Sequence, residues 1–216
     1  MRRVAIYGGT FDPVHNGHLE VARAVVKLFE LDDLIFVPAW VPPHKKNANI
    51  TSAFHRFAML TLATEEDQQL RVSTTELDAP ELPYAVETVA RMKNESERLF
   101  FLIGADSWAE ITTWHEWRRL LTMCDLIVIT RPGYDIETKA GTRANLVDVR
   151  DLDRAAVDDL IRAEQKPRVF VTNAAVVDVS ATRIRQAAKL KDLAALESMV
   201  PPAVTKYIEK YDLYRN

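Results

Sequence analysis

The chain has 216 residues, a formal net charge of −3 and 48% hydrophobic residues. These values are typical of one globular domain and exclude a disordered or collagen-like chain. Runs of Lys and Arg never exceed two residues, which argues against a nucleic-acid partner. The apolar runs fall well short of the roughly 18 residues of a membrane span. The single cysteine, Cys124, excludes an internal disulfide and favours a cytoplasmic protein.

Short apolar runs predict strands that are covered on both faces, at 4–7, 34–37, 70–73, 99–103, 126–130 and 169–171. Apolar residues at helical spacing predict helices near 19–29, 54–60, 86–90, 157–161 and 204–211. This alternation predicts a doubly wound, mostly parallel α/β sheet in a single domain, 1–216. We interpret 134–168 as an elaboration of the sheet and 180–216 as C-terminal helices. Ligands of such sheets bind beyond the carboxyl ends of the strands, so the loops that follow the strands are the candidate sites.

The first of these loops is rich in glycine, which is otherwise scarce. The chain holds only 6 glycines, against about 15 at average usage. Gly8, Gly9 and Gly17 all lie within the first 17 residues. Glycine allows close approach of a ligand, and the helix start that follows offers free amides to an anion. His15 and His18 straddle this junction, so both rings can face one phosphate-binding pocket; a zinc pair and two purely structural histidines are the alternatives.

Later loops add candidate ligand groups. Lys45, after two prolines, is either a phosphate-binding point charge or part of an exposed basic turn. Arg56, on the next predicted helix, fits a salt bridge as well as a ligand contact. Asp106, which follows Gly104 after a predicted strand, can accept from a ribose hydroxyl, hold a metal-bound water or cap the next helix. Ser180 is a good N-cap for a helix whose first amides would face an anion.

The segment from Gly8 to His18 resembles the signature of the nucleotidylyltransferase superfamily, which carries a His-x-x-His of this kind. The later segments Pro42-Pro43-His44-Lys45, Gly104-Ala105-Asp106, Trp114, Arg131-Pro132-Gly133 and Val179 to Arg185 stand in the order and approximate spacing of the bacterial nicotinate-nucleotide adenylyltransferases. This resemblance covers essentially the whole chain. It implies a Rossmann-like fold and an adenylyltransferase of NAD biosynthesis, which makes deamido-NAD and pyrophosphate from ATP and nicotinate mononucleotide by direct in-line attack. It also implies Mg²⁺ carried by the ATP phosphates.

The resemblance further implies roles for individual residues. The implied catalytic residues are His15, His18, Lys45 and Arg185. The implied ATP-binding residues are Gly8, Gly9, Thr10, Phe11, Gly17, Gly104, Asp106, Ser180, Thr182 and Arg183. The implied mononucleotide-binding residues are His44, Tyr84, Ala85, Trp114, His115 and Arg131. Two further tryptophans, Trp108 and Trp117, are expected to pack in the protein interior.

Two positions depart from the family pattern, which has Ser-Tyr-Thr at Pro83-Tyr84-Ala85 and often tyrosine at His115. The resemblance implies that backbone amides near these positions hold the nicotinate carboxylate, so recognition of the acid can persist without the threonine hydroxyl. Nicotinamide mononucleotide as the preferred acceptor remains an alternative. A nucleotide sensor without catalysis is another, although it would be expected to lose a histidine or the Ser180-to-Arg185 motif. The sequence leaves the oligomeric state open.

Overall fold

A computed structural model describes residues 1–40, 50–79, 84–95, 97–130, 145–164, 166–175 and 179–215. Its centre is one sheet, and all of the strand pairs in it are parallel. The strands are β1 (Arg2–Gly9), β2 (Asp33–Pro38), β3 (Leu70–Val72), β4 (Glu97–Gly104), β5 (Asp125–Ile129), β6 (Leu146–Asp148) and β7 (Val169–Thr172). Each strand predicted from an apolar run is present, so the doubly wound α/β fold is confirmed.

The strand order places two glycine-ended strands at the centre of the sheet. The order is β3-β2-β1-β4-β5-β7-β6, so the direction of winding reverses between β1 and β4. β1 ends at Gly9 and β4 ends at Gly104. Ligands of open α/β sheets bind at the carboxyl side of such a reversal. The fold therefore brings the first loop and the Gly104 loop to one edge.

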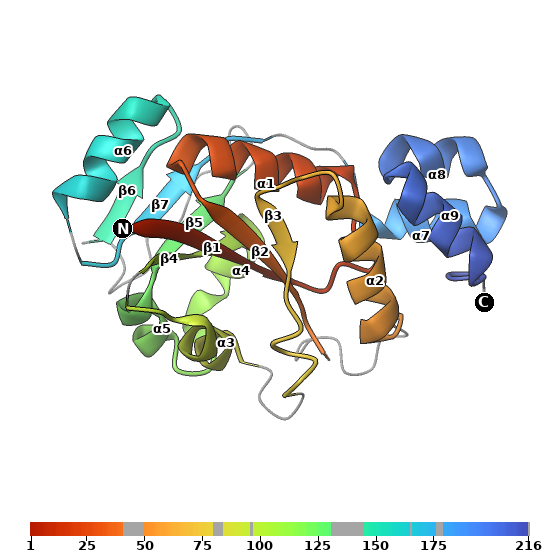
Figure 1. The fold of residues 1–216 in the computed structure, drawn as a ribbon, viewed down its shortest axis with the longest axis horizontal. Helices are drawn as coiled ribbons and strands as arrows, with labels where there is room; N and C mark the ends of the chain where they lie inside the picture. The colour runs from red at the N-terminus through yellow and green to blue at the C-terminus, as the bar shows by residue number, and fades with distance from the viewer. Residues whose placement is uncertain are drawn as a thin grey trace.

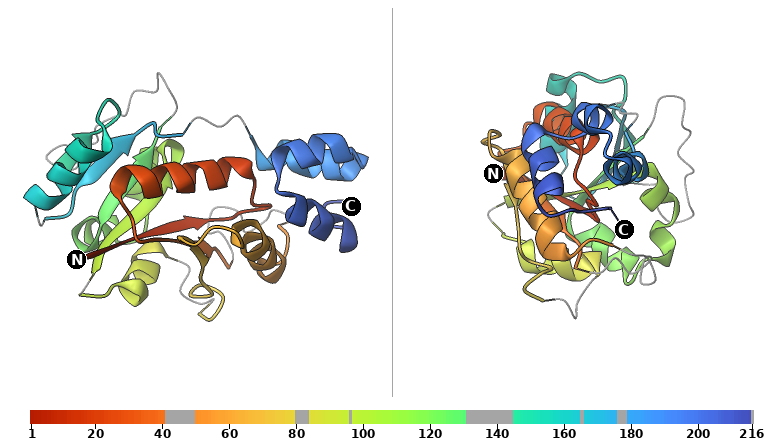
Figure 2. Two further views of the ribbon diagram at one scale, coloured as in Figure 1. Left: turned by 45° about the horizontal axis from the view of Figure 1, so that its top comes forward. Right: turned by 90° about the vertical axis from the view of Figure 1, so that its right-hand side faces the viewer.

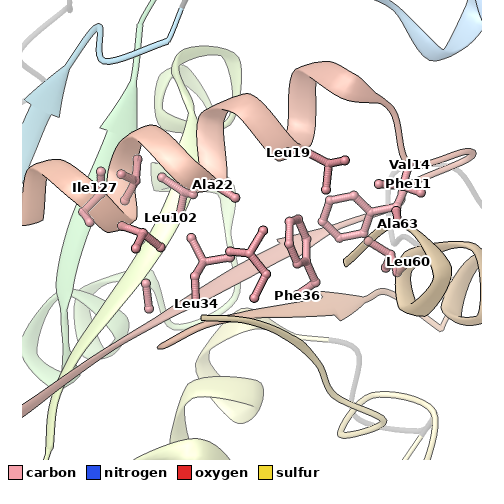
Figure 3. Packing of buried hydrophobic residues seen from close by; sticks show 14 of the residues in the cluster. Phe11, Val14, Leu19, Ala22, Leu34, Phe36, Leu60, Ala63, Leu102 and Ile127 are labelled. Carbon is pink, nitrogen blue, oxygen red and sulfur yellow. The ribbon is translucent and has the colours of Figure 1, made fainter. Parts of the chain in front are cut away.

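Helices cover both faces of the sheet (Figure 1). One face carries α1 (Asn16–Phe29), α2 (Ala53–Thr64) and α6 (Arg154–Ala163), and the other carries α3 (Ala85–Met92), α4 (Ala105–Ala109), the short helix η2 (Ile111–Thr113) and α5 (Trp117–Met123). Because side chains alternate along a strand, Ala5 packs in the first core, whereas Val4 and Ile6 pack in the second. Figure 3 shows the first core where Phe11 and Phe36 meet below Leu19.

The chain ends in three helices, α7 (Ala181–Leu190), α8 (Leu193–Met199) and α9 (Pro202–Lys210). Figure 2 shows them grouped beyond the end of the sheet at which β1 leads into the first loop. Ile184, Leu196 and Ile208 are buried, one from each helix, and extend the first core. The C-terminal helices therefore lie next to the edge that the strand order marks as the binding edge.

The short elements β6, η2 and α5 were not predicted, and α8 lies in the stretch 180–216 that was predicted only as C-terminal helices. Strand β6 has 3 residues and pairs with β7, so the described part of the expected elaboration joins the sheet. Helix α1 begins at Asn16, slightly before the expected start near His18. None of the helices in the described ranges combines the length and apolar character that crossing a membrane needs.

Candidate active site

The first loop leaves β1 through a tight contact between its own residues. Phe11 has a φ of 49° and is only 3% exposed, with its ring in the core. A Cβ added to Gly9 would lie 2.8 Å from that ring. The Phe11 ring therefore occupies the place that a side chain at position 9 would need. Because its ring is buried, Phe11 can offer a ligand only its backbone.

Three distant segments hold this loop at Asp12. The Tyr214 hydroxyl donates to the Asp12 carboxylate at 2.8 Å, and the Thr51 backbone N–H donates to the same carboxylate at 3.4 Å. The Arg185 guanidinium donates to the Asp12 carbonyl at 2.7 Å. The predicted catalytic Arg185 thus reaches the first loop from α7. Tyr214, near the end of the chain, holds the same loop.

Arg56 serves neither of the two roles considered for it. It is 1% exposed, and its guanidinium donates to the carbonyls of Thr10, Ala39, Trp40 and Thr51 at 2.6–3.1 Å. Burial lowers the pKa of this guanidinium. These bonds join the loops after β1 and β2 to the start of α2, so Arg56 positions the loops instead of pairing with a carboxylate or facing a ligand.

His15 and His18 lie together, as their spacing predicts. Their rings stack with centroids 3.6 Å apart. The His15 backbone N–H donates to Nδ1 of His18 at 3.3 Å, which leaves the hydrogen of a neutral His18 on Nε2. In the described chain, the buried Nδ1 of His15 has no hydrogen-bond partner. A polar atom buried in this way is unfavourable unless a partner arrives.

Both imidazoles are uncharged at neutral pH. Burial lowers the pKa of His15 to about 4. Burial, and then the charge of His15, lower the pKa of His18 well below its ordinary value. The two imidazoles therefore offer N–H donors in their neutral forms. They become positively charged only when a bound anion stabilises their protonated forms. Across the described residues there is no group of three or more His, Cys, Asp and Glu suited to a metal ion, so the zinc alternative gains no third ligand there.

Two pockets meet at Gly104. The histidine pocket, of about 330 Å³, is lined among others by Tyr7, His15, Gly17, His18, Gly104, Asp106, Thr130 and Val179. The tryptophan pocket, of about 270 Å³, is lined among others by Gly8, Gly9, Thr10, Glu76, Tyr84, Ala85, Gly104, Trp114 and His115. A Cβ added to Gly104 would meet nothing within 4 Å. Gly104 lines both pockets and leaves open space where a side chain would stand.

The predicted catalytic and ATP-binding residues that line the histidine pocket are His15, Gly17, His18, Gly104 and Asp106. Gly104, and not Asp106, is the N-cap of α4, so the capping role considered for Asp106 is wrong. Ser180 does cap α7, since its hydroxyl accepts from the Arg183 backbone at 3.3 Å. The Thr182 hydroxyl accepts from the Arg185 guanidinium at 3.3 Å. These α7 residues are near the first loop through Arg185 but do not line the pocket itself.

The tryptophan pocket has aromatic walls. The Trp114 ring meets Phe101 edge to face at 6.4 Å, and the Tyr84 and His115 rings lie 4.3 Å apart. Ala85 begins α3. The Glu87 and Thr88 N–H groups donate to the Tyr84 carbonyl at 3.0 and 3.1 Å, so the donors that this helix start offers a ligand, among the described residues, are the N–H groups of Ala85 and Val86. A mononucleotide ring and an acid group can therefore be held side by side here. The predicted ligand groups Gly8, Gly9 and Thr10 line this pocket and not the histidine pocket.

Sequence reasoning missed Glu76, a carboxylate in the wall of the tryptophan pocket. It stands just beyond the 3-residue strand β3, where no motif singles it out. Trp108 is 2% exposed and packs in the second core, as predicted. The other packing candidate, Trp117, begins α5 and lies under Arg118 at 4.4 Å. The predicted site residues His44, Lys45 and Arg131 lie outside the described residues.

A larger hollow, of about 540 Å³, lies far from this site, between the end of α1 and the residues before β3. Two of its arginines are already paired, Arg23 with Asp67 and Arg154 with Glu30. It also lies at the amino ends of the strands, whereas open α/β sheets bind ligands at the carboxyl ends. The paired pockets at Gly104 are therefore the better candidate.

Comparison with known proteins gives a consistent result. Residues 6–187 match the family model described as cytidylyltransferase-like. A probable nicotinate-nucleotide adenylyltransferase of Thermoanaerobacter sp. is 36% identical over 99% of this chain and 94% of that protein. A nicotinate-nucleotide adenylyltransferase of Bacillus subtilis is 32% identical over 100% of both chains. The fold is shared with the nicotinic acid mononucleotide adenylyltransferase of Plasmodium falciparum, solved in complex with NaAD, at a TM-score of 0.73, 18% identity and coverage of 99% and 98%.

Proposed function

We propose that this chain, which belongs to the cytidylyltransferase-like family and within it to the nicotinate-nucleotide adenylyltransferases, transfers the adenylyl group of ATP to nicotinate mononucleotide. The products are deamido-NAD and pyrophosphate, and the reaction belongs to NAD biosynthesis. The family resemblance inferred from the motifs is confirmed by these full-length relatives. The observation that carries the assignment of the site is the meeting of two pockets at Gly104, one beside the histidine pair and one with aromatic walls.

We assign ATP to the histidine pocket and the mononucleotide to the tryptophan pocket. A phosphate oxygen of the mononucleotide then attacks the α-phosphorus of ATP, and the bond to the pyrophosphate oxygen breaks. Because the attacking group belongs to the substrate, the protein needs no nucleophile of its own. Its contribution is to align the two nucleotides and to stabilise charge on the transferring group.

The histidine pair supplies donors where that charge develops. The Nε2–H of His18 and the unpartnered nitrogen of His15 are buried beside the pocket, where hydrogen bonds to phosphate oxygens are strong because little water competes. Arg185 adds a guanidinium next to the first loop. Lys45, which lies outside the described residues, completes the proposed set of cations.

We propose that Mg²⁺ enters with the triphosphate as part of the substrate, so we assign it no dedicated protein ligand. The proposed working unit is the single domain 1–216, with 134–168 as an elaboration and 180–216 as C-terminal helices that support the first loop. We place the reaction in the cytoplasm, which suits a chain whose cysteine, Cys124, is a free buried thiol.

The acceptor is the acid form of the mononucleotide. Its pyridine ring stacks in the tryptophan pocket against Trp114, and its carboxylate takes the first amides of α3, which begins at Ala85. These donors belong to the backbone, so they do not depend on the threonine hydroxyl that Ala85 lacks. The remaining implied contacts, His44 and Arg131, are proposed on the resemblance alone.

Pyrophosphate release with ATP and each mononucleotide in turn tests this function. We expect release with nicotinate mononucleotide and a lower kcat/KM with nicotinamide mononucleotide. The reverse preference would show that the acceptor is wrong but the chemistry right. Absence of release with both acceptors, together with ATP binding, would favour a sensor.

A further inference from the structure

The tryptophan pocket contains a carboxylate to which the proposed reaction gives no role. Glu76 lines this pocket, and its Oε1 accepts from the Thr88 hydroxyl of α3 at 2.8 Å. Burial raises the pKa of the Glu76 carboxyl, while hydrogen bonds from Thr88 and the Trp40 backbone and the charge of Arg56 act the other way. The fold thus holds an acid where water solvates it poorly. The charged form of such an acid is stabilised by a positive charge that enters the pocket.

Among the described residues, no cation forms an ion pair with Glu76, whose hydrogen bonds come from the Thr88 hydroxyl and the Trp40 backbone. Its cationic neighbours in the described chain, Arg56 and Arg91, act on it through charge and not through hydrogen bonds. The Arg56 donors are bonded to backbone carbonyls. The Arg91 guanidinium donates to the Thr75 carbonyl at 3.4 Å. The anionic charge of Glu76 therefore remains available to a ligand.

The rest of the pocket wall fits a cation. Tyr84, Phe101 and Trp114 line the same pocket, and its described lining contains neither Lys nor Arg. Aromatic faces attract quaternary nitrogens, Trp most strongly. A carboxylate set among aromatic rings is the combination that recognises a flat, positively charged group.

We propose that Glu76 is the counter-ion of the pyridinium ring of the mononucleotide and thereby sets a specificity for the positively charged ring. This inference rests on the proposed function. The ring nitrogen of such a nucleotide bears the ribose, so it is quaternary: it carries positive charge but no hydrogen to donate. A carboxylate acts on it through charge alone, and this attraction is larger in a partly desolvated pocket than in water. The substrate carboxylate is held separately, by the first amides of α3.

The test compares two acceptors that differ in ring charge. Nicotinate mononucleotide has a pyridinium ring, whereas its 1,4-dihydropyridine form keeps the carboxylate, ribose and phosphate but has a neutral ring nitrogen. Pyrophosphate release at saturating ATP gives kcat/KM for each. We expect Glu76→Gln to lower kcat/KM for the pyridinium form about tenfold and to leave that for the dihydro form within about twofold. The KM for ATP should not change.

Two matched variants separate charge from structure. Thr88→Val removes the hydrogen bond to Glu76 but keeps the carboxyl group in the pocket wall. Asp78→Asn removes an exposed carboxylate close by, whose field is screened by water and salt. Both should keep the wild-type ratio of the two kcat/KM values. Glu76→Asp, which keeps the charge, should also keep the preference for the pyridinium form, and it decides the matter if Glu76→Gln does not fold.

Three results would overturn the counter-ion role. They are equal losses with both acceptors in Glu76→Gln, a gain with the pyridinium form in that variant, and loss of the preference in Glu76→Asp. In each case the wild-type chain still transfers the adenylyl group, so the proposed function stands. If the wild-type chain releases no pyrophosphate with either acceptor, the proposed function itself is wrong.

Discussion

Acid should destabilise the folded chain through His15, and the size of the effect can be worked out from its burial. The pKa of His15 falls from an ordinary 6.5 to about 4 on folding. As the pH drops below 6.5, the unfolded chain therefore binds a proton that the folded chain does not. The stability that a neutral, buried His15 contributes is complete above pH 6.5 and is lost as the pH falls toward 4. Between pH 7.5 and 5 the loss amounts to about 2 kcal/mol.

The variant His15→Gln isolates this effect, because glutamine does not titrate. Urea unfolding of both proteins at pH 7.5 and pH 5 gives four free energies of unfolding. The wild type should lose about 2 kcal/mol more than the variant between the two pH values. The carboxylates titrate in both proteins, so their contributions cancel to first order. The charge of His15 acts on His18 only where His15 is itself protonated, which in the folded chain is near pH 4 and below. If the two proteins lose the same free energy within about 0.5 kcal/mol, His15 is not held neutral by burial and the argument for a desolvated donor pair is wrong.

Three further substitutions test the rest of the site. His18→Ala should lower kcat by about a hundredfold or more, because a buried transition-state donor is lost; turnover close to that of the wild type would refute its role. Arg56→Met should lower the free energy of unfolding by about 3 kcal/mol, since four partly buried carbonyls lose their donor. This corresponds to a fall of about 6–12 °C in Tm, and a fall below about 2 °C contradicts the positioning role. Tyr214→Phe should cost about 1 kcal/mol in urea unfolding and lower kcat without changing the KM for ATP, and an unaltered kcat would show that the bond to Asp12 does not support catalysis.

The sequence predicted what depends on local pattern. The buried strands are apolar throughout, so their runs are visible without a structure, and the spacing of His15 and His18 places both rings at one helix start. The 3-residue strand β6 and the short helices α4 and α5 carry too few residues for a period to emerge. They form because the sheet and its core are already there to pack against.

The missed features depend on contacts between distant segments. Glu76 becomes a pocket residue only when β3 pairs at the edge of the sheet and α3 brings Thr88 to it. The neutral state of the histidines follows from burial, which spacing does not reveal. Among the described residues, the partners of Arg56 are not carboxylates but backbone carbonyls of the loops after β1 and β2 and of the start of α2, and the sequence does not reveal such partners.

The reason for gathering so much structure around the first loop follows from the proposed chemistry. An enzyme without a nucleophile of its own accelerates the reaction only through alignment and fixed dipoles, and both are lost if the loop moves. Asp12 is therefore held by Tyr214, 202 residues away, and by Arg185, 173 residues away. Thr10 is held through its carbonyl by the buried Arg56. The C-terminal helices and α2 act as the rigid support that keeps the donors of the histidine pair at one fixed place beside Gly104.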